Sequence, residues 1–120
     1  MRHRQAGLKL GRNTHQRQAL FKQQAGALIL NESVKTTLAK AKLLVRLTDK
    51  LISRAKKGTL ASRRQLLAFF NRRPVVNKLV DDIALRNKTR TSGFTKLIRL
   101  GVRRSDNAMI AQVELIDKKK

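Results

Sequence analysis

Apolar residues recur every three or four positions along the first two thirds of the chain, which is the spacing of amphipathic helices. The pattern predicts four helices, over residues 14–30, 38–56, 60–70 and 74–86. Residues suited to begin or end these helices stand at the boundaries: Asn13 or Thr14, Asn31, Gly58, Thr59 and Pro74. The side chains expected to face the core are Phe21, Ala25, Leu28, Leu38, Ala41, Leu44, Val45, Leu47, Leu51, Ile52, Leu60, Leu66, Leu67, Phe70, Val75, Val76, Leu79, Val80 and Ile83.

The spacing of apolar residues changes to two near the end of the chain, which is the period of a β-strand. Residues 97–103 and 109–116 alternate in this way on either side of a polar turn at 104–107. These segments predict a β-hairpin, and the short segment 32–36 predicts one more strand. We therefore expect an α+β fold, with a helical N-terminal two-thirds packed on a small mixed sheet made of the hairpin and the strand near residues 32–36.

Length and composition favour one folded unit. Leu, Ile, Val and Phe make up 35 of the 120 residues, well above the fraction of about 20% below which chains remain disordered. Residues 1–13 contain two Gly and four basic residues without helical periodicity, so we expect an extended basic arm. The prediction is a single globular domain over residues 14–117, followed by a basic tail at 118–120.

The chain is strongly basic, with 29 Lys and Arg against 7 Asp and Glu and a net charge of +22. Four blocks, residues 1–31, 35–57, 63–78 and 86–104, contain Asp49 as their one acidic residue. A polyanion relieves self-repulsion of this size, so basic blocks along the whole chain predict several faces that contact nucleic-acid phosphates. A membrane-surface protein instead concentrates its charge on one amphipathic helix with aromatic anchors.

One predicted helix carries a regular basic stripe. Lys42, Arg46, Lys50 and Arg54 follow at four-residue spacing, which places them on one helix face. A charged helix face usually has no role beyond contact with solvent. Such faces normally carry both positive and negative side chains, however, and here Asp49 is the one acidic residue among the basic ones. Phosphate contact is therefore the favoured interpretation of this stripe.

The residues give little support for catalysis or metal binding. The chain has no Cys, which excludes a thiolate zinc site and a cysteine nucleophile. His3 and His15 have no further ligands nearby, and Asp81 and Asp82 diverge by about 100° on a helix. We expect no catalysis, no metal, no cofactor and no small-molecule substrate. The longest apolar stretch is far short of the ~20 residues of a membrane span.

The mode of nucleic-acid recognition can also be narrowed. Residues 60–86 could form a helix-turn-helix, but the second helix offers only Asn77, Lys78 and Arg86 to read bases. A stacking platform for single strands needs aromatic residues, and only Phe94 lies near the predicted strands. Backbone and shape recognition of structured RNA fits the sequence better than either.

Several segments resemble the bacterial-type large-subunit ribosomal protein seventeen family, in one register over nearly the whole chain. They are the opening MRHR, Gly7, residues 9–12, 17–19 and 35–42, the stretch SGFTKLIRLG at 92–101, Arg103 and Arg104, and residues 113–115. The sequence departs from the family pattern at four positions. Gln16 stands where His is usual, and Ser92, Phe94 and Val102 stand where Gly, Tyr and Pro are common.

This resemblance implies a structural protein of the large ribosomal subunit that supports translation by ordering 23S-type ribosomal RNA through phosphate contacts. Its partners would be this RNA and neighbouring large-subunit ribosomal proteins, in a cytoplasmic ribosome that is bacterial rather than organellar. The alternative is a free-standing nucleoid-associated protein or RNA chaperone. The expected RNA-binding residues are Arg2, His3, Arg4, Lys9, Arg12, Asn13, Arg17, Lys22, Lys35, Thr36, Thr37, Lys40, Lys42, Arg46, Lys50, Arg54, Arg90, Ser92, Gly93, Arg99, Arg103 and Arg104.

Overall fold

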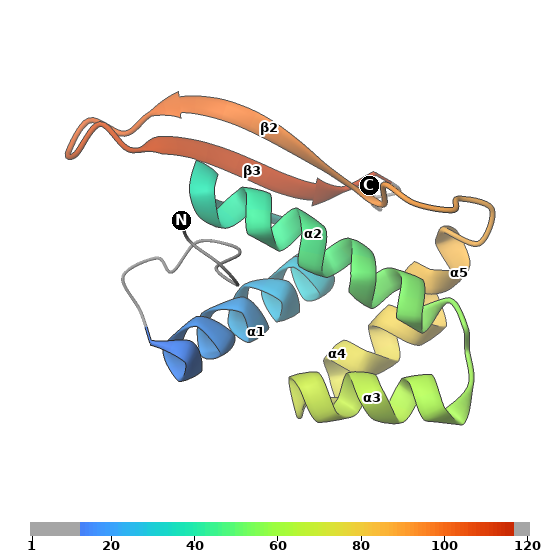
Figure 1. Cartoon of the computed structure of the whole chain (residues 1–120). Helices are drawn as coiled ribbons and strands as arrows, with labels where there is room; N and C mark the ends of the chain where they lie inside the picture. Colours follow the sequence, from blue (N-terminus) through green and yellow to red (C-terminus); the bar gives the residue numbers. More distant parts are fainter. Residues whose placement is uncertain (1–12, 117–120) are drawn as a thin grey trace, which may run out of the picture.

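The computed structural model describes residues 13–116 and confirms the α+β fold (Figure 1). The helices are α1 (Thr14–Asn31), α2 (Leu38–Ala55), α3 (Leu60–Phe70), α4 (Arg73–Lys78) and α5 (Ala84–Arg86), with a π-helical turn, η1 (Leu79–Ile83), between the last two. The strands are β1 (Ser33–Thr37), β2 (Thr95–Val102) and β3 (Met109–Leu115). The predicted arm, except Asn13, and the predicted tail at 118–120 lie outside the described residues.

The three strands form one sheet in the order β1-β3-β2. The central strand β3 pairs Val113 with Val34 of β1 on one side and with Leu97 of β2 on the other. Both pairings are antiparallel, so the sheet is not mixed as expected from the sequence. Strands β1 and β2 do run in the same direction, but β3 separates them and no parallel pair forms.

A β-bulge interrupts the pairing of β2 with β3. Leu100 is an extra residue between the pairs formed by Arg99 and Gly101. Gly101 has a φ angle of 128°, a conformation that residues with a Cβ rarely adopt. The extra residue shifts the alternation by one position, so Ile98 and Val102 lie on opposite faces of the sheet. The even spacing of these residues in the sequence would have placed them on one face.

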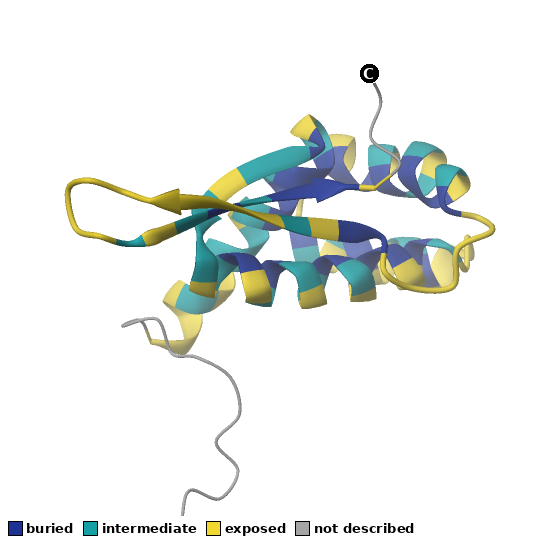
Figure 2. Cartoon of the chain, turned by 90° about the horizontal axis from the view of Figure 1, so that it is seen from above, coloured by how far each residue is buried: buried dark blue, intermediate teal, exposed yellow. Residues whose placement is uncertain are grey.

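Helix α2 is the central element of the fold. It lies against the sheet on one side and contacts α1, α3, α5 and η1. Its buried residues are Ala41, Leu44, Thr48, Leu51, Ile52 and Ala55, while Leu38, Val45 and Leu47 are partly buried and pack against the core. None of the described helices covers the other face of the sheet, and the end of the hairpin extends beyond the helices as an exposed loop (Figure 2).

The predicted inward position of Leu60 is wrong. Helix α3 runs over the predicted range and is capped by Thr59, whose hydroxyl accepts a hydrogen bond from the Ser62 amide. Its buried row is Ser62, Leu66 and Phe70, at four-residue spacing. Leu60 stands outside this row at the first helical position, and 63% of it is exposed.

The end of α1 also differs from the prediction. Glu32, rather than Asn31, takes the left-handed conformation, with φ of 65°. The Glu32 amide donates to the Leu28 carbonyl, and its side chain is held by Arg86 at 2.6 Å and Lys78 at 3.5 Å. Burial alone would lower the pKa of Arg86, but its bonds to the two carboxylates of Glu32 and Asp82 raise it. These ion pairs fasten the end of α1 to the segment that contains α4, η1 and α5.

Candidate nucleic-acid interface

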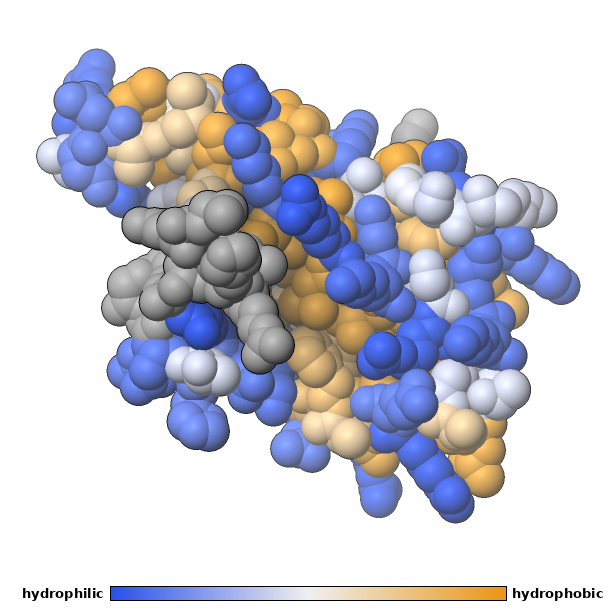
Figure 3. Space-filling view, in the orientation of Figure 1, coloured by the Kyte–Doolittle hydropathy of each residue, from blue (hydrophilic) through white to orange (hydrophobic). Residues whose placement is uncertain are grey.

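The basic stripe predicted on α2 is confirmed as an exposed helix face. Lys42, Arg46, Lys50 and Arg54 are all exposed, and none forms an ion pair with a residue in the range 13–116. The row spans about 18 Å of helix at 1.5 Å per residue. Hydrophilic side chains stand out along this part of the molecule over more apolar surface (Figure 3). The opposite side of α2 forms the core, so packing fixes the direction in which these cations point.

Asp49, the one acid beside the stripe, is turned away from the cations. Its Oδ1 accepts hydrogen bonds from the Phe94 amide and the Thr95 hydroxyl, both at 3.2 Å. Burial raises the pKa of Asp49 above its ordinary value, although these two bonds oppose the rise. Asp49 therefore anchors the loop before β2 to α2, and it does not neutralise the stripe.

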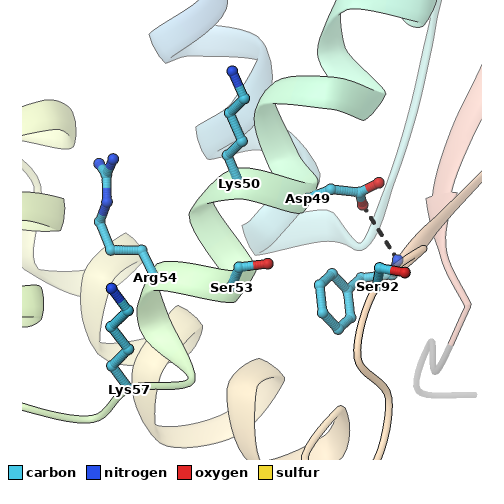
Figure 4. Close-up of a pocket in the computed structure, with 7 residues that line it drawn as sticks. Asp49, Lys50, Ser53, Arg54, Lys57 and Ser92 are labelled. Carbon is cyan, nitrogen blue, oxygen red and sulfur yellow. Dashed lines mark hydrogen bonds between the residues drawn. The ribbon is translucent and has the colours of Figure 1, made fainter.

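This anchor brings two predicted groups of site residues together. A hollow of about 370 Å³ separates the end of α2 from the loop that enters β2 (Figure 4). It is lined by Asp49, Lys50, Ser53, Arg54, Lys57, Ser92 and Phe94. Sequence reasoning had selected Lys50, Arg54 and Ser92 but missed Ser53 and Lys57. Ser53 and Lys57 follow Lys50 by three and seven residues. Residues at these spacings lie on the same helix face, so the sequence could have indicated both.

The loop before β2 carries the other predicted residues of this region. Arg90, Ser92 and Gly93 are exposed, and Gly93 has a φ angle of 66°, at which a residue with a Cβ would be strained. The Lys56 ammonium donates a hydrogen bond to the Arg90 carbonyl and lies 5.1 Å from the centre of the Phe94 ring. Lys56 thus helps to hold the loop in place.

The predicted residues of α1 are partly engaged within the fold. Asn13 caps the helix: its side chain accepts from the Gln16 amide, and the Gln16 side chain accepts from the Asn13 amide. Arg17 is half-buried. The Lys22 ammonium lies 5.9 Å from the centre of the Phe69 ring, within the range of a cation–π contact.

The predicted residues near β1 differ in their exposure. Lys35 is exposed, whereas Thr37 and Lys40 are half-buried. The Thr36 hydroxyl accepts a hydrogen bond from the Gln24 amide group at 3.0 Å. This bond ties β1 to α1, so Thr36 has a structural partner in the fold.

The hairpin carries three predicted arginines, and one of them is paired. Arg103 bonds to both carboxylate oxygens of Asp106, at 3.0 and 2.6 Å. The hydrogen bond from Arg103 and a second from the Ala108 amide lower the pKa of Asp106 to about 2. Arg99 and Arg104 are exposed and have no ion pair with a described residue. The charge available at the hairpin end is therefore smaller than a count of its arginines suggests.

Five predicted residues cannot be placed: Arg2, His3, Arg4, Lys9 and Arg12 lie outside the described residues. Within residues 13–116, no three His, Asp or Glu side chains gather as metal ligands would. None of the described helices is both long and apolar enough to cross a membrane.

The structure is a small α+β fold in which one face of α2 is buried and the opposite face carries a row of exposed cations without acidic partners among the described residues. These are properties of basic RNA-binding proteins. A model of the family described as ribosomal protein L17 matches residues 20–116. The chain therefore belongs to the ribosomal protein L17 family, whose members are structural constituents of the large ribosomal subunit. The resemblance stated from the sequence motifs is confirmed.

Proposed function

We propose that this chain binds and orders large-subunit, 23S-type ribosomal RNA through phosphate contacts on several surfaces and has no catalytic role. The observation that carries the proposal is the α2 stripe, whose four cations have no acidic partner within residues 13–116. The proposed protein partners are neighbouring large-subunit ribosomal proteins, in a bacterial cytoplasmic ribosome. In this proposal, the chain consists of a basic arm at 1–13 and a single domain at 14–117.

The physical basis is electrostatic and geometric. A helix that is packed on its other side fixes the backbone positions from which the cations extend, so only their side chains must be ordered when they meet a row of phosphates. Each contact releases counterions condensed on the RNA, which is a favourable entropic contribution. Arg46 and Arg54 can also donate two parallel hydrogen bonds to one phosphate. Such contacts recognise the backbone and shape of folded RNA rather than its base sequence.

Neutralising two cations of the stripe tests this proposal. The double variant Arg46→Gln with Lys50→Gln should reduce the slope of log affinity against log salt by about two, or roughly one per lost phosphate contact. The melting temperature should stay nearly unchanged, since both side chains are exposed. Filter binding to large-subunit ribosomal RNA at several salt concentrations measures the slope.

The matched control removes the same charge from other exposed positions. Arg64 on α3 and Arg72 before α4 are exposed. They belong to the basic block 63–78 but not to the individual residues expected to bind RNA, so Arg64→Gln with Arg72→Gln should reduce the slope clearly less than the α2 double variant does. Equal reductions in the two double variants would contradict a specific role for the α2 face. They would show that net charge alone determines binding.

A further inference from the structure

A groove lies at the C-terminal end of α2, where this helix passes beside α5 (Figure 1). One wall is the connection from α2 to α3, and the other is formed by η1 and α5. The lining residues are Ala55, Lys56, Gly58, Val80, Ala84, Leu85 and Lys88. None of them belongs to the residues expected to bind RNA, so the groove is a surface for which the proposed phosphate contacts give no role.

The size of the groove suits one apolar side chain. Its volume is about 180 Å³, close to that of the apolar cavities of about 150 Å³ that hold a benzene molecule. Small-molecule sites are larger, at roughly 300–1,000 Å³. Ala55, Val80 and Ala84 give the walls an apolar character, to which the aliphatic stem of Lys56 adds. A large aliphatic or aromatic side chain therefore fits, whereas a nucleotide does not.

Two exposed leucines border the groove. Leu85 lines it directly, and Leu60 follows Gly58 by two residues on the side of the α2–α3 connection. Each leucine is 63% exposed, more than any other large apolar residue in the described part of the chain. Single exposed apolar residues are common on protein surfaces, but here two of them stand next to an apolar groove. An inserted side chain would remove surface of both the groove and the leucines from water.

The second wall contains an unusual helical turn. In η1 the Ala84 amide donates to the Leu79 carbonyl, five residues earlier rather than four. Such π-helical turns are rare and occur frequently at functional sites. The wider turn changes the directions of the residues that follow it. Leu85 extends into solvent directly after the buried residues Ile83 and Ala84.

The charges around the groove favour an acidic group on its occupant. Its two charged lining residues are Lys56 and Lys88, and no described Asp or Glu lines it. The Lys56 ammonium is engaged by the Arg90 carbonyl. Lys88 is exposed and forms no ion pair within residues 13–116, while both acids of η1 are paired with arginines. Lys88 can therefore pair with a carboxylate that lies next to the inserted side chain.

A protein fits this surface better than RNA does. RNA would offer phosphates to Lys88, but it presents sugars and polar base edges and has no large aliphatic group to fill the groove. Interfaces between proteins have an apolar core and a polar rim, and their anchoring side chains lie in well-packed pockets. The groove with Leu60 and Leu85, edged by Lys88, has this arrangement.

We infer that the groove between the α2–α3 connection and α5 is an anchor site for a neighbouring large-subunit ribosomal protein. The partner inserts one large apolar side chain beside Leu85, and an acidic residue next to it pairs with Lys88. This inference rests on the proposed ribosomal function, because it assigns a surface to the protein partners of that proposal.

Photo-crosslinking in the assembled large subunit tests the site. Leu85 is replaced by p-benzoylphenylalanine, and purified subunits that contain the chain are irradiated. The chain should become joined mainly to one ribosomal protein, at an apolar residue with Asp or Glu a few positions away. Products with RNA alone, products with a second copy of this chain, or no product would overturn the inference. A joined segment without an acidic residue would overturn the pairing with Lys88.

The control for this experiment carries the same photoreactive group on another surface. Ala68 is exposed on α3, and it does not line the groove. Its replacement by p-benzoylphenylalanine should not yield the product obtained from position 85. The same product from both positions would overturn the anchor site, since it would show proximity to the partner without a specific contact.

A matched pair of substitutions measures what the anchor contributes. Leu85→Gln should leave the melting temperature, the affinity for RNA and the salt slope nearly unchanged, since the side chain is exposed and carries no charge. The rate at which the chain dissociates from the large subunit in a salt wash should rise about tenfold. Leu100→Gln removes an exposed leucine from the hairpin and should not change this rate.

Equal dissociation rates for the Leu85 and Leu100 variants would overturn the anchor site. Such a result would leave the RNA-binding proposal standing, because the salt slope and the Arg46 and Lys50 variants test that proposal separately. A Leu85 variant with a reduced affinity for isolated RNA would also contradict the inference, since it would assign the groove to RNA.

Discussion

Raising the salt concentration from about 50 to about 200 mM should lower the affinity of this chain for large-subunit ribosomal RNA by a factor of roughly 10³–10⁵, if six to ten phosphates are contacted. The expectation follows from a net charge of +22 and from the exposed cations on α2, in the loop before β2 and on the hairpin. Each neutralised phosphate contributes about 0.7–0.9 to the log–log slope. The affinity is measured by filter binding over a series of monovalent salt concentrations.

The slope also separates this mechanism from its competitors. A protein that recognised RNA mainly through base stacking or through apolar surface would lose little affinity over the same range of salt. A slope shallower than about two, which corresponds to only two or three phosphate contacts, would contradict binding through several basic surfaces.

Leu44→Ala should lower the free energy of unfolding by about 2–5 kcal/mol, since Leu44 lies at the centre of α2 and has no exposed surface. The loss combines the transfer free energy of the removed methyl groups with the cavity that they leave. Urea denaturation followed by circular dichroism measures the change. Leu44 lies on the packed side of α2, so the affinity of the folded variant for RNA should change little.

The same substitution at Leu60 provides the control. Leu60 is 63% exposed, so Leu60→Ala should change the free energy of unfolding by no more than about 0.5 kcal/mol. Similar losses at both positions would contradict the assignment of buried and exposed helix faces. They would also place Leu60 in the core, as the sequence pattern alone suggested.

Helix boundaries could be predicted well where the controlling residues are local. The bounds of α3, Leu60–Phe70, agree with the prediction because the Thr59 cap and the preceding Gly58 act within a few residues. The Asn13 cap of α1 was recognisable for the same reason. Hydrophobic spacing was sufficient to assign the buried and basic faces of α2 because this helix is long and strongly periodic.

The errors arise where distant residues decide the local conformation. Glu32 rather than Asn31 takes the left-handed conformation after α1, and its side chain pairs with Arg86, 54 positions away in the sequence. The bulge at Leu100 depends on how β2 meets β3, which a regular alternation of apolar residues conceals. The position of Leu60 depends on which row of α3 the neighbouring helices cover.

The candidate site was predictable in part for the same physical reason. Four-residue spacing revealed the α2 stripe, because a single helix creates it. The hollow beside Phe94 requires a hydrogen bond from Phe94 to Asp49 across 45 positions, and no local pattern indicates this contact. In the sequence, Asp49 looked like an acidic interruption of the basic stripe. In the structure, it holds the loop before β2 against α2 through its hydrogen bonds to Phe94 and Thr95.

Sucrose-gradient fractionation of a cell extract tests most directly whether this chain is a stably bound structural component of the large subunit. The chain should sediment with the large subunit in a constant ratio to its RNA, and it should remain there after a wash in moderate salt. Contacts on several surfaces dissociate together and therefore slowly, although each is weakened by salt. Recovery of the chain mainly in the slowly sedimenting fractions, or with the nucleoid, would contradict a structural role and would favour a free-standing nucleoid-associated protein or RNA chaperone.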